Sequence, residues 1–150
     1  MPGNPDAIGK TYGPDVYAVG REKIVEYARA VGESEPLYLD LAAARAAGYA
    51  DVVAPPMFAV VFQARALAPA MTDPEVGIDF ARLLHGSQEM RWGPLVVAGD
   101  EIATTATVSA IQERAGLEFF VFELRSVNQH DETVATTTWT NIVRPPEEPA

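Results

Sequence analysis

The segment that most constrains the fold is an apolar stretch that follows two adjacent prolines, Pro55 and Pro56. From Met57 to Ala68 the only polar side chains are those of Gln63 and Arg65. A proline in the first turn of a helix costs no hydrogen bond, because the N–H groups of that turn have no partner within the helix. These 12 residues would span about 18 Å, which is too short to cross a membrane. The stretch is therefore predicted to be a buried helix at the centre of a small domain.

The second half of the chain changes to the two-residue period of β-strands. Strands are predicted at 83–92, 101–110, 120–125 and 133–143, with a short extended segment at 15–19 and hairpin turns at 113–116 and 128–132. Helical spacing predicts an amphipathic helix over 21–31 and a second helix from Pro36 through Ala47. Helices followed by antiparallel hairpins indicate an α+β fold in which an antiparallel sheet wraps around the central apolar helix. This arrangement is the hot-dog architecture.

The length of 150 residues fits one domain, so residues 1–150 are predicted to form a single hot-dog domain. Only the ends, 1–5 and 144–150, are expected to be disordered, because they are rich in Gly, Pro and charged residues. The start of the chain lacks the basic flank and apolar run of a secretory signal. We therefore expect a soluble, cytoplasmic protein.

The composition excludes several classes of function. Eleven Lys and Arg against 21 Asp and Glu give a formal charge of −10, which opposes binding to nucleic acid or to an anionic membrane surface. The chain has no Cys and two His, so neither a thiolate metal site nor a three-histidine zinc site can form. We expect no metal and no cofactor.

Two motifs resemble the signature of the MaoC-like dehydratases and R-specific enoyl hydratases. That family carries G-D-x-N-P-I-H-x-D followed by I-A-H-G-M, and this chain has G-E-S-E-P-L-Y-L-D over Gly32–Asp40 and V-A-P-P-M over Val53–Met57. The stretches His85–Glu89 and Pro94–Asp100 are similar to a later strand and an A-G-D turn of the same family. The resemblance runs in order through residues 8–143 and implies a hot-dog fold that acts on acyl thioesters.

The positions of the family's catalytic Asp and His are occupied here by Glu33 and Tyr38. In those enzymes the pair acts on the proton at carbon 2 of the thioester and on the water at carbon 3. Histidine, with an ordinary pKa of about 6.5, suits this work, whereas a phenol of pKa about 10 hardly abstracts a proton at neutral pH. The family's H-G before the central helix is Pro55-Pro56 here, which removes backbone N–H donors that would stabilise the thioester oxyanion. The sequence therefore assigns a catalytic role to no residue, and Glu33 and Tyr38 are only the positions equivalent to the dyad.

This combination is closest to the non-catalytic subunit of heterodimeric (3R)-hydroxyacyl-ACP dehydratases. The resemblance implies that the chain lines a tunnel for the acyl tail, with candidate substrate-binding residues Pro56, Met57, Phe58, Val61 and Phe62. It also implies a partner, either a hot-dog subunit that bears the dyad or a second copy of this chain, and acyl-ACP or acyl-CoA as substrate.

Other interpretations stay open at this point. The chain could be a self-sufficient homodimeric hydratase that uses Glu33 or His85 as its base, or a module that binds or senses acyl thioesters without reaction. Each candidate also has a purely structural interpretation: Glu33 as a solvated loop residue, Tyr38 as a side chain packed at the domain edge, and the Met and Phe side chains as core. His85 fits a structural role on a strand, and His130 lies in an expected exposed hairpin turn.

Overall fold

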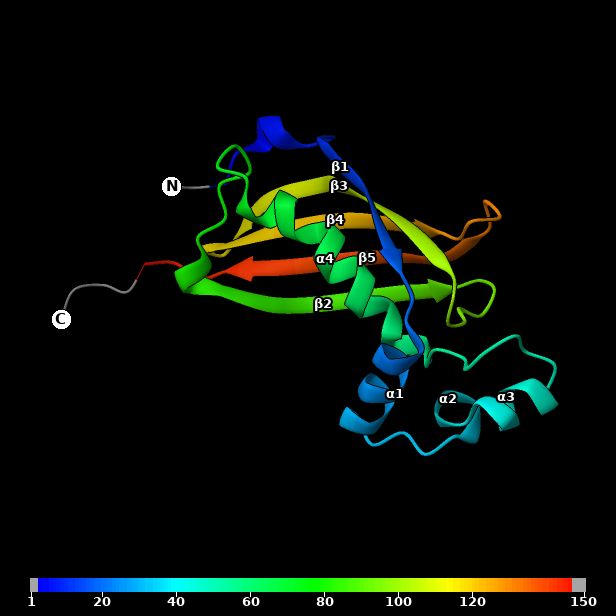
Figure 1. Ribbon diagram of the computed structural model, residues 1–150. Helices are drawn as coiled ribbons and strands as arrows, with labels where there is room; N and C mark the ends of the chain where they lie inside the picture. Colours follow the sequence, from blue (N-terminus) through cyan, green and yellow to red (C-terminus); the bar gives the residue numbers. More distant parts are fainter. Residues whose placement is uncertain (1–2, 147–150) are drawn as a thin grey trace.

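Within residues 3–146, which the computed structural model describes, five antiparallel strands form one sheet that curves around helix α4 (Figure 1). The strands are β1 (Thr11–Ala18), β2 (Leu83–Trp92), β3 (Glu101–Arg114), β4 (Leu117–Val127) and β5 (Thr133–Val143), in the order β1-β3-β4-β5-β2. The helices are α1 (Arg21–Ala30), α2 (Pro36–Leu39), α3 (Leu41–Ala46) and α4 (Ala59–Thr72), with 3-10 turns η1 (Pro5–Ala7), η2 (Pro56–Phe58) and η3 (Phe80–Arg82). The predicted α+β architecture, an antiparallel sheet around a central apolar helix, is confirmed.

Local sequence signals explain most element boundaries. The hairpin between β3 and β4 turns at Ala115 and Gly116, which both have positive φ, 54° and 76°, as a two-residue hairpin loop requires. The predicted second helix divides in two at Asp40, which has an extended backbone. Its carboxylate accepts a hydrogen bond from the Ala42 N–H at 2.8 Å and so caps α3. The prediction of one helix from Pro36 to Ala47 was wrong because this capping role was not recognised.

The central helix begins as predicted and ends later. The prolines lead into η2, where the Phe58 N–H donates to the Pro55 carbonyl at 2.9 Å. Helix α4 then continues to Thr72 with Pro69 inside its last turns, beyond the predicted end at Ala68. The helix packs mainly against β3 and β1, and its two halves bury different parts of the core.

Two clusters of buried residues lie along this helix. The α4-start cluster consists of Val19, Ile24, Val52, Ala54, Phe58, Ala59, Phe62, Ile102, Val134 and Ala135. The α4-end cluster consists of Ala7, Leu67, Ala70, Val76, Ala106, Val108, Ile111, Phe120, Phe122, Leu124 and Val143. Helices α1, α2 and α3 lie beyond the edge of the sheet at which α4 begins (Figure 1).

The chain ends make defined contacts where they are described. The Asn4 N–H donates to the Val76 carbonyl at 3.1 Å, and the Arg144 N–H donates to the Arg82 carbonyl at 3.0 Å. Residues 1–2 and 147–150 lie outside the described residues. The expected disorder of 1–5 and 144–150 stays a prediction for the isolated chain in solution.

Candidate functional site

An apolar pocket opens where α4 begins. It has a volume of about 350 Å³, a size typical of a small-ligand site. Its walls come from the entry to α4, from the end of β2 with the loop that follows, and from the start of β5. The lining residues are Ala54, Pro55, Pro56, Phe58, Ala59, Phe62, Trp92, Gly93, Pro94, Leu95, Val96, Val134 and Ala135. All of these side chains are apolar except for the indole N–H of Trp92, so the pocket suits a hydrocarbon ligand.

Hydrogen bonds hold the rim of the pocket in place. The Trp92 indole N–H donates to the Pro56 carbonyl at 2.8 Å, which ties the end of β2 to the start of the helix. The Gly93 N–H donates to the Val134 carbonyl at 2.9 Å, and the Ala54 N–H donates to the Val96 carbonyl at 2.8 Å. A Cβ at Gly93 would collide with the backbone carbonyl of Thr133, so glycine is required at this turn.

Aromatic rings form the inner wall. Phe58 and Phe62 are one helical turn apart with ring centroids separated by 6.3 Å, and Tyr27 of α1 packs edge-on against Phe58 at 5.5 Å. Tyr17 of β1 lies against both phenylalanines. Edge-to-face packing of this kind fixes ring orientation. Phe58 and Phe62, which line the pocket, are therefore held in place by the rings of Tyr17 and Tyr27 behind them.

The structure separates the five predicted substrate-binding residues. Pro56, Phe58 and Phe62 line the pocket. Met57 is 45% exposed and does not line it, and Val61 is half-buried against the α4-start cluster. The rim and the β5 wall were not predicted, because they lie far from Pro56 in the sequence and come together only through the pairing of β2 with β5, in which Trp92 lies opposite Ala135.

Glu33 and Tyr38 lie outside the pocket but on a segment linked to it. Glu33 is exposed just after α1, and Tyr38 is half-buried on α2. The carbonyl of Leu37 accepts a hydrogen bond from the Val53 N–H at 2.9 Å, which connects α2 to the strand-like segment that leads into the pocket. Burial, followed by the charges of Glu33 and Glu35, raises the pKa of Tyr38 above its ordinary value. At neutral pH the Tyr38 hydroxyl is therefore deprotonated even less often than a free phenol, so it can donate a proton but hardly abstract one.

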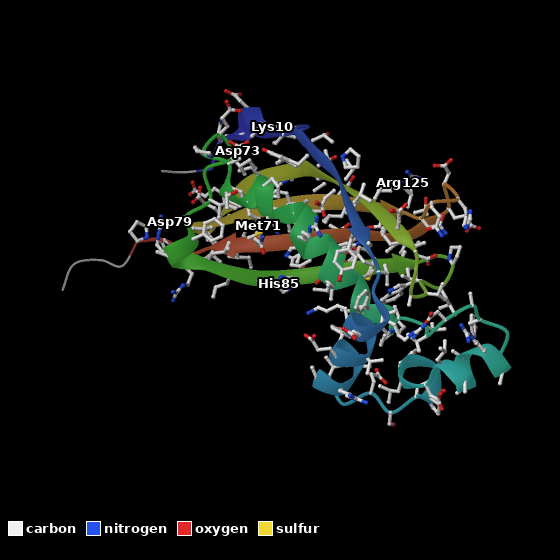
Figure 2. The ribbon with its side chains drawn as sticks, in the orientation of Figure 1. Lys10, Met71, Asp73, Asp79, His85 and Arg125 are labelled. Carbon is white, nitrogen blue, oxygen red and sulfur yellow. The ribbon has the colours of Figure 1, made fainter. Side chains whose placement is uncertain are left out.

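Neither histidine joins these residues. His85 is exposed on β2, where its ring packs edge-on against Trp139 at 5.2 Å. It lies seven residues from Trp92 at the pocket rim, which is roughly 23 Å along a strand, and Figure 2 places it on β2 away from α1 and α2. His130 is exposed in the turn between β4 and β5, as predicted.

A second hollow in the described part of the chain differs from this pocket because it is lined by polar side chains. A wider groove of about 780 Å³ lies on the face of the sheet opposite α4, and polar side chains such as Arg91, Thr105 and Arg125 line it. Among residues 3–146 no three His, Asp or Glu side chains come together in a way that would hold a metal ion. No helix in the described part of the chain combines the length and apolarity needed to cross a membrane.

Asp100, at the base of the loop that forms the pocket rim, has a structural role. Its carboxylate is buried and accepts hydrogen bonds from the Val97 N–H and from the side chain of Gln129, both at 2.9 Å. These bonds fix the turn from which β3 starts. The same turn also positions Val96, which lines the pocket.

Comparison with known proteins gives a consistent result. The family model of the FAS1-like dehydratase domain region matches residues 6–137. A UPF0336 protein of Clavibacter michiganensis is 43% identical over 145 residues, which cover 96% of this chain and 97% of that protein.

Solved structures share the fold over nearly the whole chain. A chain of the C-terminally truncated HadBC (3R-hydroxyacyl-ACP dehydratase) complex of Mycobacterium tuberculosis superposes with a TM-score of 0.80 at 26% identity, covering 91% of this chain and 97% of that one. A MaoC-like dehydratase superposes with a TM-score of 0.83 at 31% identity, covering 93% of this chain and 42% of that one. The hot-dog fold predicted from the sequence is thus confirmed.

Proposed function

This chain belongs to the family of FAS1-like dehydratase domain regions and has the hot-dog fold of MaoC-like dehydratases; from this premise we propose that it is the acyl-chain-binding, non-catalytic subunit of a (3R)-hydroxyacyl-thioester dehydratase. Residues 1–150 then form one such domain. The reaction would be the removal of water from a 3-hydroxyacyl thioester, or its reverse, in fatty acid metabolism.

One observation carries the proposal: an apolar pocket is linked to a segment in which the catalytic Asp and His of the dehydratase family are replaced. The pocket accepts a hydrocarbon, whereas the nearby dyad positions hold Glu33 and Tyr38, and the pKa of Tyr38 is raised by burial. Pro55 and Pro56 contribute no N–H groups to an oxyanion site. Loss of one such donor typically raises the barrier by about 2.7–4 kcal/mol. The histidine of the dyad and the oxyanion donors are therefore absent from a chain that keeps an apolar pocket, and this combination supports a role in binding.

The missing groups would come from a partner. In the proposed division of labour, a hot-dog chain with an intact dyad removes the proton from carbon 2 and returns a proton to the hydroxyl leaving from carbon 3 as water. This chain holds the acyl tail between α4 and β5, which orients the reacting carbons toward the partner. Orientation of this kind lowers the barrier without any proton transfer by this chain.

Sheet edges supply a way to form the pair. Strands β1 and β2 are the two edges of the sheet, and unpaired edges favour association with another chain. The structural neighbour HadBC is a complex of two subunits, which supports the same arrangement here. The charge of −10 disfavours docking of an acidic carrier protein on this subunit, so the carrier would dock mainly on the partner.

The test is an activity assay on the purified chain with a (3R)-3-hydroxyoctanoyl thioester, alone and mixed with a short hot-dog chain that carries G-D-x-N-P-I-H, sought first in the neighbouring gene. We expect no turnover alone and turnover in the mixture, with both unaffected by Glu33→Gln. Robust turnover by the chain alone would contradict the proposal. Turnover lost in Glu33→Gln or in a His85→Ala variant would instead support the homodimeric hydratase.

Acyl-thioester binding without turnover in any combination would favour a binding or sensing module. No described feature of the structure singles out that role, because a sensor and a non-catalytic subunit need the same pocket. The mixture assay separates them.

A further inference from the structure

A buried polar group lies on α4 one turn after Ala59, which lines the apolar pocket. Gln63 of α4 is fully buried and hydrogen-bonded at both ends of its amide. Thr137 of β5 donates to its Oε1 at 2.8 Å, and its Nε2 donates to the Ser126 hydroxyl of β4 at 3.3 Å. Ser126 is in turn 2.8 Å from the hydroxyl of Thr104 on β3. We name Gln63, Thr104, Ser126 and Thr137 the Gln63 bridge.

The geometry of helix and strand places this bridge at the inner end of the pocket. Ala59 lines the pocket, and Gln63 follows four residues later on the same face of α4, about 6 Å deeper. Ala135 lines the opposite wall, and Thr137 follows two residues later on the same face of β5, also between 6 and 7 Å deeper by the usual rise of about 3.3 Å per residue. The pocket lies between α4 and β5. The hydrogen bond between Thr137 and Gln63 joins these two elements one helical turn after Ala59 and so closes the inner end of the pocket.

The bridge also separates the two apolar clusters. Phe62 and Ala135 belong to the α4-start cluster, whereas Leu67 and Phe122 beyond the bridge belong to the α4-end cluster. Met90, opposite Thr137 on β2, packs against the α4-start cluster and continues the same wall. An alkyl chain that extended past this point would have to displace a buried amide from its partners, and buried polar groups are rarely left without them.

We propose that Gln63, held by Thr137 and Ser126, is the end wall of the acyl pocket and sets the longest acyl chain that this protein accepts. This inference rests on the proposed acyl-binding function. The seven residues from Pro56 to Gln63 give the pocket a depth of about 10 Å. That depth suits a medium-length chain such as octanoyl and is shorter than a hexadecanoyl chain.

The experiment measures the affinity of the purified chain for a series of acyl-pantetheines, from butyryl to hexadecanoyl, by titration calorimetry. Burial of each further methylene strengthens binding about fourfold, so affinity should rise steeply to about octanoyl and then stop rising. In Gln63→Ala the rise should continue to longer chains. Leu67→Ala, which truncates a fully buried side chain one turn beyond Gln63 and leaves the amide in place, is the matched control and should retain the wild-type break.

A second variant shortens the pocket where Gln63→Ala lengthens it. This test remains available if Gln63→Ala does not fold. Ala59→Leu fills the pocket one turn above Gln63 and should move the break to shorter chains, with folding checked by circular dichroism. An unchanged break in Gln63→Ala or in Ala59→Leu, or a wild-type affinity that keeps rising to hexadecanoyl, would overturn the assignment of Gln63 while leaving the proposed function intact. Failure of the wild-type chain to bind any acyl-pantetheine would overturn both.

Discussion

The two ends of α4 differ in what closes them. At its start, prolines and the Trp92 rim leave an apolar pocket that is open to the outside. At its end, Lys10 of the segment before β1 contacts Asp73 at 2.6 Å and also pairs with Glu75, and the Tyr12 hydroxyl donates to Asp73 at 2.7 Å. Figure 2 shows Lys10 and Asp73 together at this end of the molecule.

This difference between the two ends of α4 assigns them different roles: the end of the helix contributes to stability alone, and the start contributes to stability and to ligand binding. The end of the helix is fastened by charged groups and sits over an aromatic core that includes Phe120 and Phe122, both fully buried. The start of the helix carries aromatic rings too, but there Phe58 and Phe62 also line the pocket. Changes at the α4 end should therefore affect folding alone, whereas changes at the α4 start should also affect ligand binding.

The largest effect is expected from Phe122→Ala. Truncation of a buried phenylalanine leaves a cavity and should lower the free energy of unfolding by about 3–5 kcal/mol. Octanoyl-pantetheine affinity of the fraction that remains folded should be unchanged. Phe58→Ala should cost a similar amount in unfolding and also weaken octanoyl binding, as measured by urea denaturation and calorimetry. Equal loss of binding in both variants would show that the two ends are not independent.

A smaller effect is expected from Trp92→Ala at the pocket rim. The loss of the indole wall and of its hydrogen bond to Pro56 should weaken octanoyl binding about tenfold, or about 1.4 kcal/mol. Phe80→Ala at the other end is a matched control, because Phe80 is 54% and Trp92 52% exposed. The control should bind like the wild type. Weaker binding by Phe80→Ala, or normal binding by Trp92→Ala, would contradict the location of the site.

Much of this comparison can be predicted from the sequence, because the signals are local. The apolar run after Pro55-Pro56 predicts the buried helix, and the two-residue period predicts four of the strands. Pro56, Phe58 and Phe62 could be assigned to the pocket because they lie at the start of that helix. Trp92, Val134 and Gln63's partners could not, because they depend on the register between strands distant in sequence, in which Trp92 faces Ala135 and Met90 faces Thr137.

The smallest expected effect is on the stability of the fold at low pH, through Asp73 at the end of α4. Hydrogen bonds from Lys10, Tyr12 and the Glu75 N–H lower the pKa of Asp73 from its usual 3.8 to about 2. The stabilisation is therefore fully present above about pH 4 and is lost as the pH falls through 2. Asp73→Asn should be less stable than the wild type at pH 5, and the difference should vanish toward pH 2.

This comparison is made by urea denaturation at each pH. Asp51, whose pKa is also lowered to about 2 by Arg21, is present in both proteins and cancels in the difference. If the difference in the free energy of unfolding stays constant from pH 5 to pH 2, the ionised carboxylate of Asp73 does not stabilise this end of the helix.

The most direct test of the division between binding and chemistry is a crystal structure of this chain with a dyad-bearing partner and a non-reactive analogue of a 3-hydroxyoctanoyl thioester. We expect the alkyl tail between Phe58, Phe62 and Ala135, ending at Gln63, with the thioester beside the partner's Asp and His. A tail bound wholly within the partner, or a thioester seated between Glu33 and Tyr38, would contradict the proposed function.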